Sequence, residues 1–130
     1  MNPFTTGGAL LRVVSGINYF NSHSGPGIRK AREEGDYALA RDIQVKGTSR
    51  FADYINPKLK ITYEIYGQEN IPQDGPVLIV PNHQGYADIL LIYSIFKHMQ
   101  TGFIAKKELS KIGIIQKAAE NTGTIFLNRG

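Results

Sequence analysis

The sequence predicts an α/β fold in which an N-terminal helical segment is followed by a partial, mainly parallel sheet with packed helices. In the C-terminal half, short apolar runs of β-forming residues alternate with longer helical stretches. This alternation is typical of parallel sheets whose crossover connections are helices. The N-terminal part instead has charges of both signs and no strand-like alternation. With 130 residues, 42% of them hydrophobic, the chain can form one small core.

The composition restricts the chemistry. The chain has no cysteine, which excludes disulfides, thiolate metal sites and a cysteine nucleophile. A net charge of +4 favours an anionic partner such as a nucleic acid, a phospholipid head group or a phosphorylated substrate. Because the basic residues are scattered and form no nucleic-acid motif, we expect no nucleic-acid partner. The three histidines lack ligand spacing, so we expect no metal site.

Residues 1–27 have two interpretations, a flexible Gly- and Ser-rich tail or a short helix on a membrane surface. The best apolar stretch, residues 9–20, is interrupted by Arg12 and is shorter than the ~20 residues that span a bilayer. Residues 21–27 are expected to form a linker. The chain is therefore divided into an N-terminal segment, 1–27, and a partial domain, 28–130.

The next stretch is predicted to be helical and then extended. Residues 28–55 are typical of a helix, with breaks possible at Gly35 and Gly47 and an end near Pro57. Apolar and polar residues alternate over 61–66, which predicts a strand.

The remainder is predicted to continue as strand, helix, strand, helix and strand. The apolar run 77–80 is typical of a strand covered on both faces. Residues 87–99 form a largely buried helix, apolar nearly all round. The last predicted elements are a strand over 102–105, an amphipathic helix over 107–121 with Gly123 as its C-terminal cap, and a third buried strand over 124–127.

The chemically informative stretch, residues 82–88, lies where a predicted strand ends and a helix begins, the usual place for ligands in α/β sheets. His83 and Asp88 are five residues apart, which is about 140° around a continuous helix, so the pair needs a turn that Gly85 permits. A neutral imidazole can accept a proton from an alcohol while a carboxylate orients it. On spacing alone, a loop histidine bonded to backbone and an aspartate capping a helix explain the pair better.

Three ordered blocks resemble the 1-acyl-sn-glycerol-3-phosphate acyltransferase family. Residues 81–89 (Pro-Asn-His-Gln-Gly-Tyr-Ala-Asp-Ile) are similar to its signature block, which has a histidine and an aspartate separated by four residues (HX4D). Residues 103–109 and 123–129 are similar to two later segments in order and spacing, and residues 66–72 resemble the lead-in. The resemblance extends over roughly residues 35–130.

The resemblance implies specific roles. His83 is the general base that activates the acceptor hydroxyl, and Asp88 orients His83. Substrate binding is assigned to Asn82, Gly85, Lys106 and Arg129. Of these, Arg129 binds the acceptor phosphate, and Lys106 or Lys107 adds to that site unless both lysines only form a solvated helix start.

The implied reaction transfers a fatty acyl group from acyl-CoA or acyl-carrier protein to the sn-2 hydroxyl of lysophosphatidate, giving phosphatidate without an acyl-enzyme. No cofactor is implied beyond the acyl donor. The expected partners are lysophosphatidate, the donor and a membrane surface, with the protein peripheral or monotopic on the cytoplasmic face.

The sequence departs from the family in lacking its third block, a Glu-Gly-Thr-Arg-like segment, and its fourth, proline-containing block. The alternative function is therefore an inactive, truncated lipid- or membrane-binding remnant. Without later strands, an apolar sheet edge would be exposed, so we expect poor stability or self-association. A monomer with a cooperative thermal transition would contradict that expectation.

Overall fold

The computed structural model describes residues 6–82 and 87–128 and confirms the α/β class, with a mostly helical chain and one small parallel sheet. Its helices and strands are α1 (Thr6–His23), α2 (Gly25–Glu33), α3 (Tyr37–Lys58), α4 (Ala87–Ile95), β1 (Ile104–Lys106), α5 (Gly113–Thr122) and β2 (Ile125–Leu127). Two short 3-10 helices, η1 (Gln68–Asn70) and η2 (Lys107–Lys111), complete the elements.

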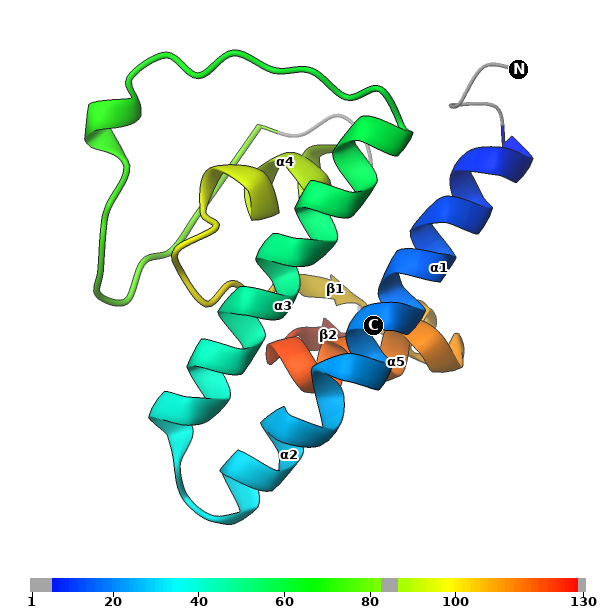
Figure 1. Ribbon diagram of the computed structural model, residues 1–130, viewed down its shortest axis with the longest axis vertical. Coiled ribbons are helices and arrows are strands. Elements are labelled where there is room, and N and C mark those ends of the chain that lie inside the picture. Colours follow the sequence, from blue (N-terminus) through cyan, green and yellow to red (C-terminus); the bar gives the residue numbers. More distant parts are fainter. Residues whose placement is uncertain (1–5, 83–86, 129–130) are drawn as a thin grey trace.

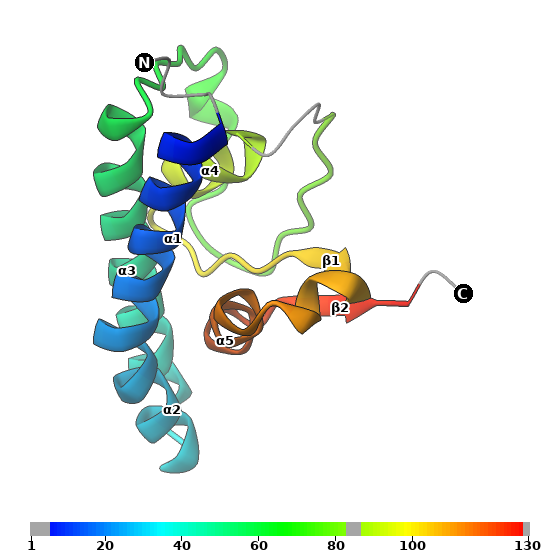
Figure 2. The ribbon, with the colours of Figure 1, turned by 90° about the vertical axis from the view of Figure 1, so that its right-hand side faces the viewer.

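The three N-terminal helices form one layer, with α1 lying beside α3 (Figure 1). In the perpendicular view, β1, β2 and α5 project from one side of that layer (Figure 2). Helix α5 contacts both α1 and α2, while α4 contacts α3. The N-terminal helices therefore support both the small sheet unit and α4, in which the block 81–89 ends.

The N-terminal segment is helical over its described part. Helix α1 runs to His23 and α2 begins at Gly25, so the predicted linker over 21–27 is wrong. The two helices meet at Ser24, whose backbone N–H donates to the Phe20 carbonyl at 2.9 Å and continues the helical pattern. Whether 1–27 and 28–130 are separate units stays a prediction.

The helix predicted over 28–55 breaks once. Gly35, with φ of +75°, lies between α2 and α3, and the Asp36 side chain accepts a hydrogen bond from the Leu39 N–H at 3.1 Å as the N-cap of α3. Helix α3 then continues through Gly47 and ends one residue after Pro57. The predicted break at Gly35 is thus confirmed, and the possible break at Gly47 is absent.

Two buried apolar clusters stabilise the helical layer. Phe20, Ile28, Ala31 and Ala40 join α1, α2 and α3. Ile55, Leu59 and Leu90 form the second cluster, where α3 meets α4. Full burial of an isoleucine, leucine or phenylalanine side chain contributes about 1.5–3 kcal/mol. The core therefore lies mainly between helices rather than against the sheet.

Two strands predicted between α3 and α4 are absent from the structure. Residues 61–66 and 77–80 belong to no sheet. Leu78 and Val80, expected to be buried on both faces, are each 82% exposed. A run of β-forming residues becomes a covered strand only when a neighbouring strand pairs with its backbone and other elements cover its faces. Among the described residues, neither condition is met here.

The later helices differ from the predicted ones in length. Helix α4 ends at Ile95 rather than near residue 99, and only part of its surface is buried, since Ile89 is 40% exposed. The stretch 107–121 divides into η2 and α5. The cap at Gly123 is confirmed, because this glycine has φ of +75° directly after α5.

Strands β1 and β2 are parallel, as predicted, with Ile104 opposite Ile125 and Lys106 opposite Leu127. They are not buried, since Ile104 is 65% exposed and Ile125 60%. Only the middle residue of each strand is half-buried. The prediction of a buried strand over 124–127 is therefore wrong, and the expectation of an exposed sheet edge with poor stability or self-association stays a prediction.

Tyr93 of α4 lies between the rings of Phe51 and Phe103, with centroid distances of 6.4 and 5.2 Å. Burial raises the pKa of its hydroxyl well above the ordinary value near 10, and a hydrogen bond with Thr122 offsets this only in part. Because the unfolded chain ionises first, stability is fully present below pH 10 and is lost as the pH rises above it.

We expect the free energy of unfolding to fall above pH 10 by up to about 1.4 kcal/mol per pH unit from this group. Urea unfolding between pH 9 and 11 measures the effect, and Tyr93→Phe should remove this part of the slope. Tyr37→Phe, at a tyrosine that is 66% exposed, is the control. Equal slopes for the parent and Tyr93→Phe would contradict the assignment.

Candidate functional site

Two strand ends meet at one edge of the small sheet. Because β1 and β2 are parallel, their last residues, Lys106 and Leu127, lie side by side at the carboxyl edge. Both lysines of this region, Lys106 and Lys107, are exposed there. The carboxyl edge of a parallel sheet is the usual place for ligands, and a lysine is a mobile point charge suited to phosphate. This edge therefore carries the described half of the predicted phosphate site.

Asp88 lies in the first turn of α4, as expected for a carboxylate that the helix dipole favours. Its residue is half-buried. Asn82, at the other side of the signature block, is exposed. The predicted positions of His83, Gly85 and Arg129 lie outside the described residues. The structure thus places Lys106 beside Leu127 at the carboxyl edge of the sheet and Asp88 at a helix start.

Polar contacts hold α4 against α3, and they were not predicted from the sequence. Asn56 Nδ2 donates to Ser94 Oγ at 2.6 Å, and Ser94 Oγ donates to the Leu90 carbonyl at 2.9 Å. Lys97 forms an ion pair with Asp53, about one turn before Asn56 in α3. Ser94 is a buried hydroxyl near the end of a mostly apolar helix, and that contrast was the signal available in the sequence. These contacts hold the helix that carries Asp88.

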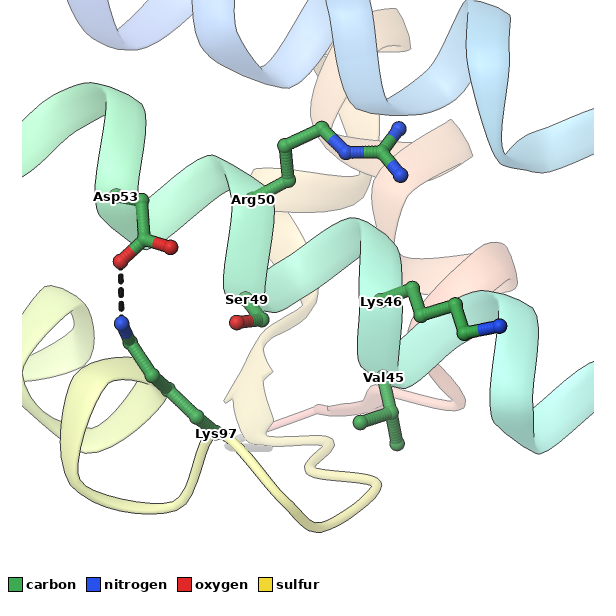
Figure 3. Close-up of a pocket in the computed structure, with 6 residues that line it drawn as sticks. All are labelled: Val45, Lys46, Ser49, Arg50, Asp53 and Lys97. Carbon is green, nitrogen blue, oxygen red and sulfur yellow. Dashed lines mark hydrogen bonds and ion pairs between the residues drawn. The ribbon is translucent and has the colours of Figure 1, made fainter.

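A depression of about 330 Å³ lies on α3 beside the end of α4, and none of the residues that line it is a predicted site residue. Figure 3 shows Lys97 directed at Asp53, whereas Lys46 and Arg50 extend away from Lys97. Cations that bind one phosphate must converge on a common point. These do not, so the depression offers no convergent anion site.

The other two histidines make backbone contacts. His98 Nε2 donates to the Pro72 carbonyl at 2.8 Å, which ties the extended segment before the signature block to the end of α4. His23 Nδ1 donates to the Tyr19 carbonyl within α1. Over residues 6–82 and 87–128, no group of acidic or histidine side chains is arranged to hold a metal ion.

Comparisons with known proteins match part of the chain. The model of the family described as Acyltransferase matches residues 62–130, which is more than half of the sequence and includes all three motif blocks. A Neisseria gonorrhoeae protein named 1-acyl-sn-glycerol-3-phosphate acyltransferase is 34% identical over 53 residues, covering 41% of this chain and 20% of that protein.

A Chlamydomonas reinhardtii protein of the same name is 42% identical over 76 residues, covering 56% of this chain and 21% of that protein. The chain thus spans about a fifth of the length of these curated relatives. No solved structure matches significantly.

Proposed function

Because the chain belongs to the Acyltransferase family, we propose that it transfers a fatty acyl group to the sn-2 hydroxyl of 1-acyl-glycerol-3-phosphate and forms phosphatidate, a step of phospholipid biosynthesis. The observation that carries the proposal is the family match over 62–130, which contains the signature block and the two later blocks. The names of the similar Neisseria and Chlamydomonas proteins support the choice of acceptor. The donor is acyl-CoA or acyl-carrier protein.

In the proposed reaction, His83 accepts the proton of the acceptor hydroxyl as its oxygen attacks the thioester carbonyl. Asp88 orients the imidazole and stabilises the charge that it gains. The carbonyl oxygen becomes an oxyanion, for which backbone N–H groups near Gly85 and the start of α4 are the proposed donors. The thiolate then leaves and takes up the proton that His83 had accepted. The acceptor itself is the nucleophile, and no cofactor is required.

The acceptor phosphate is proposed to bind at the carboxyl edge of the sheet. Arg129 supplies a bidentate donor and Lys106 a second positive charge, while Asn82 and Gly85 contact the substrates near the base. The parallel register supports this arrangement, since it places Lys106 opposite Leu127, two residues before Arg129. Phosphate binding at this edge would hold the sn-2 hydroxyl for attack.

The proposed partner surface is an anionic membrane on the cytoplasmic face, with the protein peripheral or monotopic. Helix α1 exposes Leu10 and Leu11, at 63% and 71%, and Val14. The adjacent α3 carries Lys58, whose ammonium lies 4.2 Å from the centroid of the Tyr54 ring. Exposed apolar side chains on one helix, with a cation on the helix that packs against it, suit a bilayer interface. None of the helices described is both long and apolar enough to cross a bilayer.

We expect Leu11→Asp to weaken binding to vesicles of anionic phospholipid by about tenfold or more, because a leucine buried in the interface contributes about 1.5 kcal/mol or more. Co-sedimentation at fixed ionic strength measures the partition. Leu39→Asp is the matched control, because Leu39 is 45% exposed on α3 and the charge change is the same. Equal vesicle binding by the two variants would contradict the assignment of α1 to the membrane-binding surface.

The second candidate function is a membrane- or lipid-binding remnant without turnover. The exposed apolar residues of α1 and of the sheet favour it, because they fit binding without any chemistry. Acyl transfer from a labelled long-chain acyl-CoA separates the two, with lysophosphatidate and monoacylglycerol compared as acceptors. The proposed enzyme esterifies lysophosphatidate in preference, because only that acceptor carries a phosphate. Vesicle binding without product would instead identify the remnant.

A further inference from the structure

Gln44 of α3 is a fully buried amide that joins three segments distant in sequence. Its Nε2 donates to the Thr122 carbonyl at 3.1 Å and to the Thr101 carbonyl at 3.4 Å. Its Oε1 accepts from Gln100 Nε2 at 2.9 Å. The residue has 0% exposure, and the amide therefore makes all of these contacts away from water. A buried side chain of this polarity is retained only where its hydrogen bonds are made.

The two carbonyls occupy equivalent places ahead of the two strands. Thr101 lies three residues before Ile104, and Thr122 lies three residues before Ile125. Ile104 and Ile125 are the first register pair of β1 and β2. The Gln44 NH2 group thus binds both segments three residues before the Ile104–Ile125 pair. This aligns the two strands before their ladder begins.

The segments around Gln44 are packed closely enough to transmit this alignment. A Cβ on Gly102 would lie 2.9 Å from the Thr122 carbonyl oxygen, so only glycine allows the two chains to approach there. Thr124 Oγ1 accepts a hydrogen bond from the Phe103 N–H at 3.2 Å, and the Ile125 N–H donates to the Phe103 carbonyl at 2.8 Å. The polar contacts run without a gap from α3 to the first rung of the sheet.

We propose that Gln44 is a positioning residue that sets the register of β1 and β2 and thereby the place of Lys106 at their carboxyl edge. Each strand has three residues, so the ladder alone offers few hydrogen bonds to fix the register. A slip of one residue would displace Lys106 by about 3.3 Å and direct its side chain to the opposite face. The consequence for substrate rests on the proposed function, whereas the register itself does not.

Spin labels can measure the register directly, because the chain has no cysteine of its own. Ile104→Cys and Ile125→Cys place nitroxides on two exposed side chains of one register pair, whose backbones lie about 5 Å apart. Gln44→Met, in the doubly labelled chain, removes the amide while keeping the length of the side chain. Thr48→Val is the matched control, since Thr48 is a buried residue one turn along α3 whose hydroxyl donates to the Gln44 and Val45 carbonyls.

We expect strong dipolar broadening of the nitroxide spectrum in the parent and in Thr48→Val, and a loss of that broadening in Gln44→Met with helical circular dichroism retained. Unchanged broadening in a folded Gln44→Met chain would overturn the proposal. If Gln44→Met does not fold, Gln100→Ala decides, because Gln100 is exposed and its loss frees the Gln44 amide to turn. Broadening in Gln100→Ala equal to that of the parent would then overturn it.

Activity provides a second readout. Displacing Lys106 should raise KM for lysophosphatidate by about tenfold in Gln44→Met, while KM for acyl-CoA stays unchanged. If Gln44 had only a structural role, Thr48→Val and Gln44→Met would change the KM for lysophosphatidate to the same extent. If the parent forms no product, the proposed function fails, and the spin-label spectra alone decide whether Gln44 sets the register.

Discussion

Replacing His83 with alanine is expected to lower the rate of acyl transfer to lysophosphatidate by about 10² to 10⁴. That factor is what a positioned general base contributes to proton transfer in the transition state. The alanine variant keeps the backbone but leaves no group to take the proton of the acceptor hydroxyl. Initial rates with labelled acyl-CoA, at saturating acceptor, measure the loss.

Two further variants make the result specific. Asp88→Asn should also slow transfer, because an amide can favour the wrong imidazole tautomer and cannot stabilise the imidazolium. His98→Ala should leave the chemical step unchanged, since His98 contacts the Pro72 carbonyl instead. A His83→Ala chain that retains the parental rate would refute the assignment of the base.

Gly47→Val is expected to lower the free energy of unfolding by about 3 kcal/mol. Gly47 is buried where α3 crosses α1, and a Cβ there would lie 2.5 Å from Ser24 Oγ and 2.8 Å from Phe20 Cε1. No rotamer relieves a clash of the Cβ itself, so the helices must separate or Phe20 must leave the core, and overpacking of this kind costs about 1–3 kcal/mol or more. This cost exceeds the gain of up to about 1 kcal/mol from removing a helical glycine.

Urea unfolding followed by circular dichroism tests the change. Gly113→Val is the matched control, because Gly113 also lies in a helix but no heavy atom lies within 4 Å of a Cβ placed there. We expect the control to differ from the parent by less than about 1 kcal/mol. Similar midpoints for the two variants would show that α1 and α3 do not approach at Gly47.

Local signals predicted the elements that depend on local chemistry. The cap at Gly123, the break at Gly35 and the parallel pair before and after α5 all follow from glycine conformation and from the alternation of strand and helix. The strand predicted over 77–80 is absent, because composition shows only that these residues would suit a paired and covered strand. It does not show whether a partner strand is present. Gly47 was misread for a related reason, since a glycine that breaks a helix and one that admits a neighbouring helix look alike in sequence.

In the candidate site, too, only the residues that belong to a local sequence pattern could be predicted. His83 and Asp88 are predicted from the resemblance of residues 81–89 to a family block, and the structure adds the position of Asp88 at the start of α4. Gln44 gave no such signal. Its partners Thr101 and Thr122 lie 57 and 78 residues away, so its role depends on the packing of α3 against the sheet unit.

The most direct measurement is mass spectrometry of the lipid formed from lysophosphatidate and a long-chain acyl-CoA, with the parent chain and His83→Ala run side by side. We predict phosphatidate that carries the donor acyl chain at the sn-2 position, formed by the parent and not by the variant. Phosphatidate from neither chain, or in equal amounts from both, would contradict acyl transfer by these 130 residues through His83.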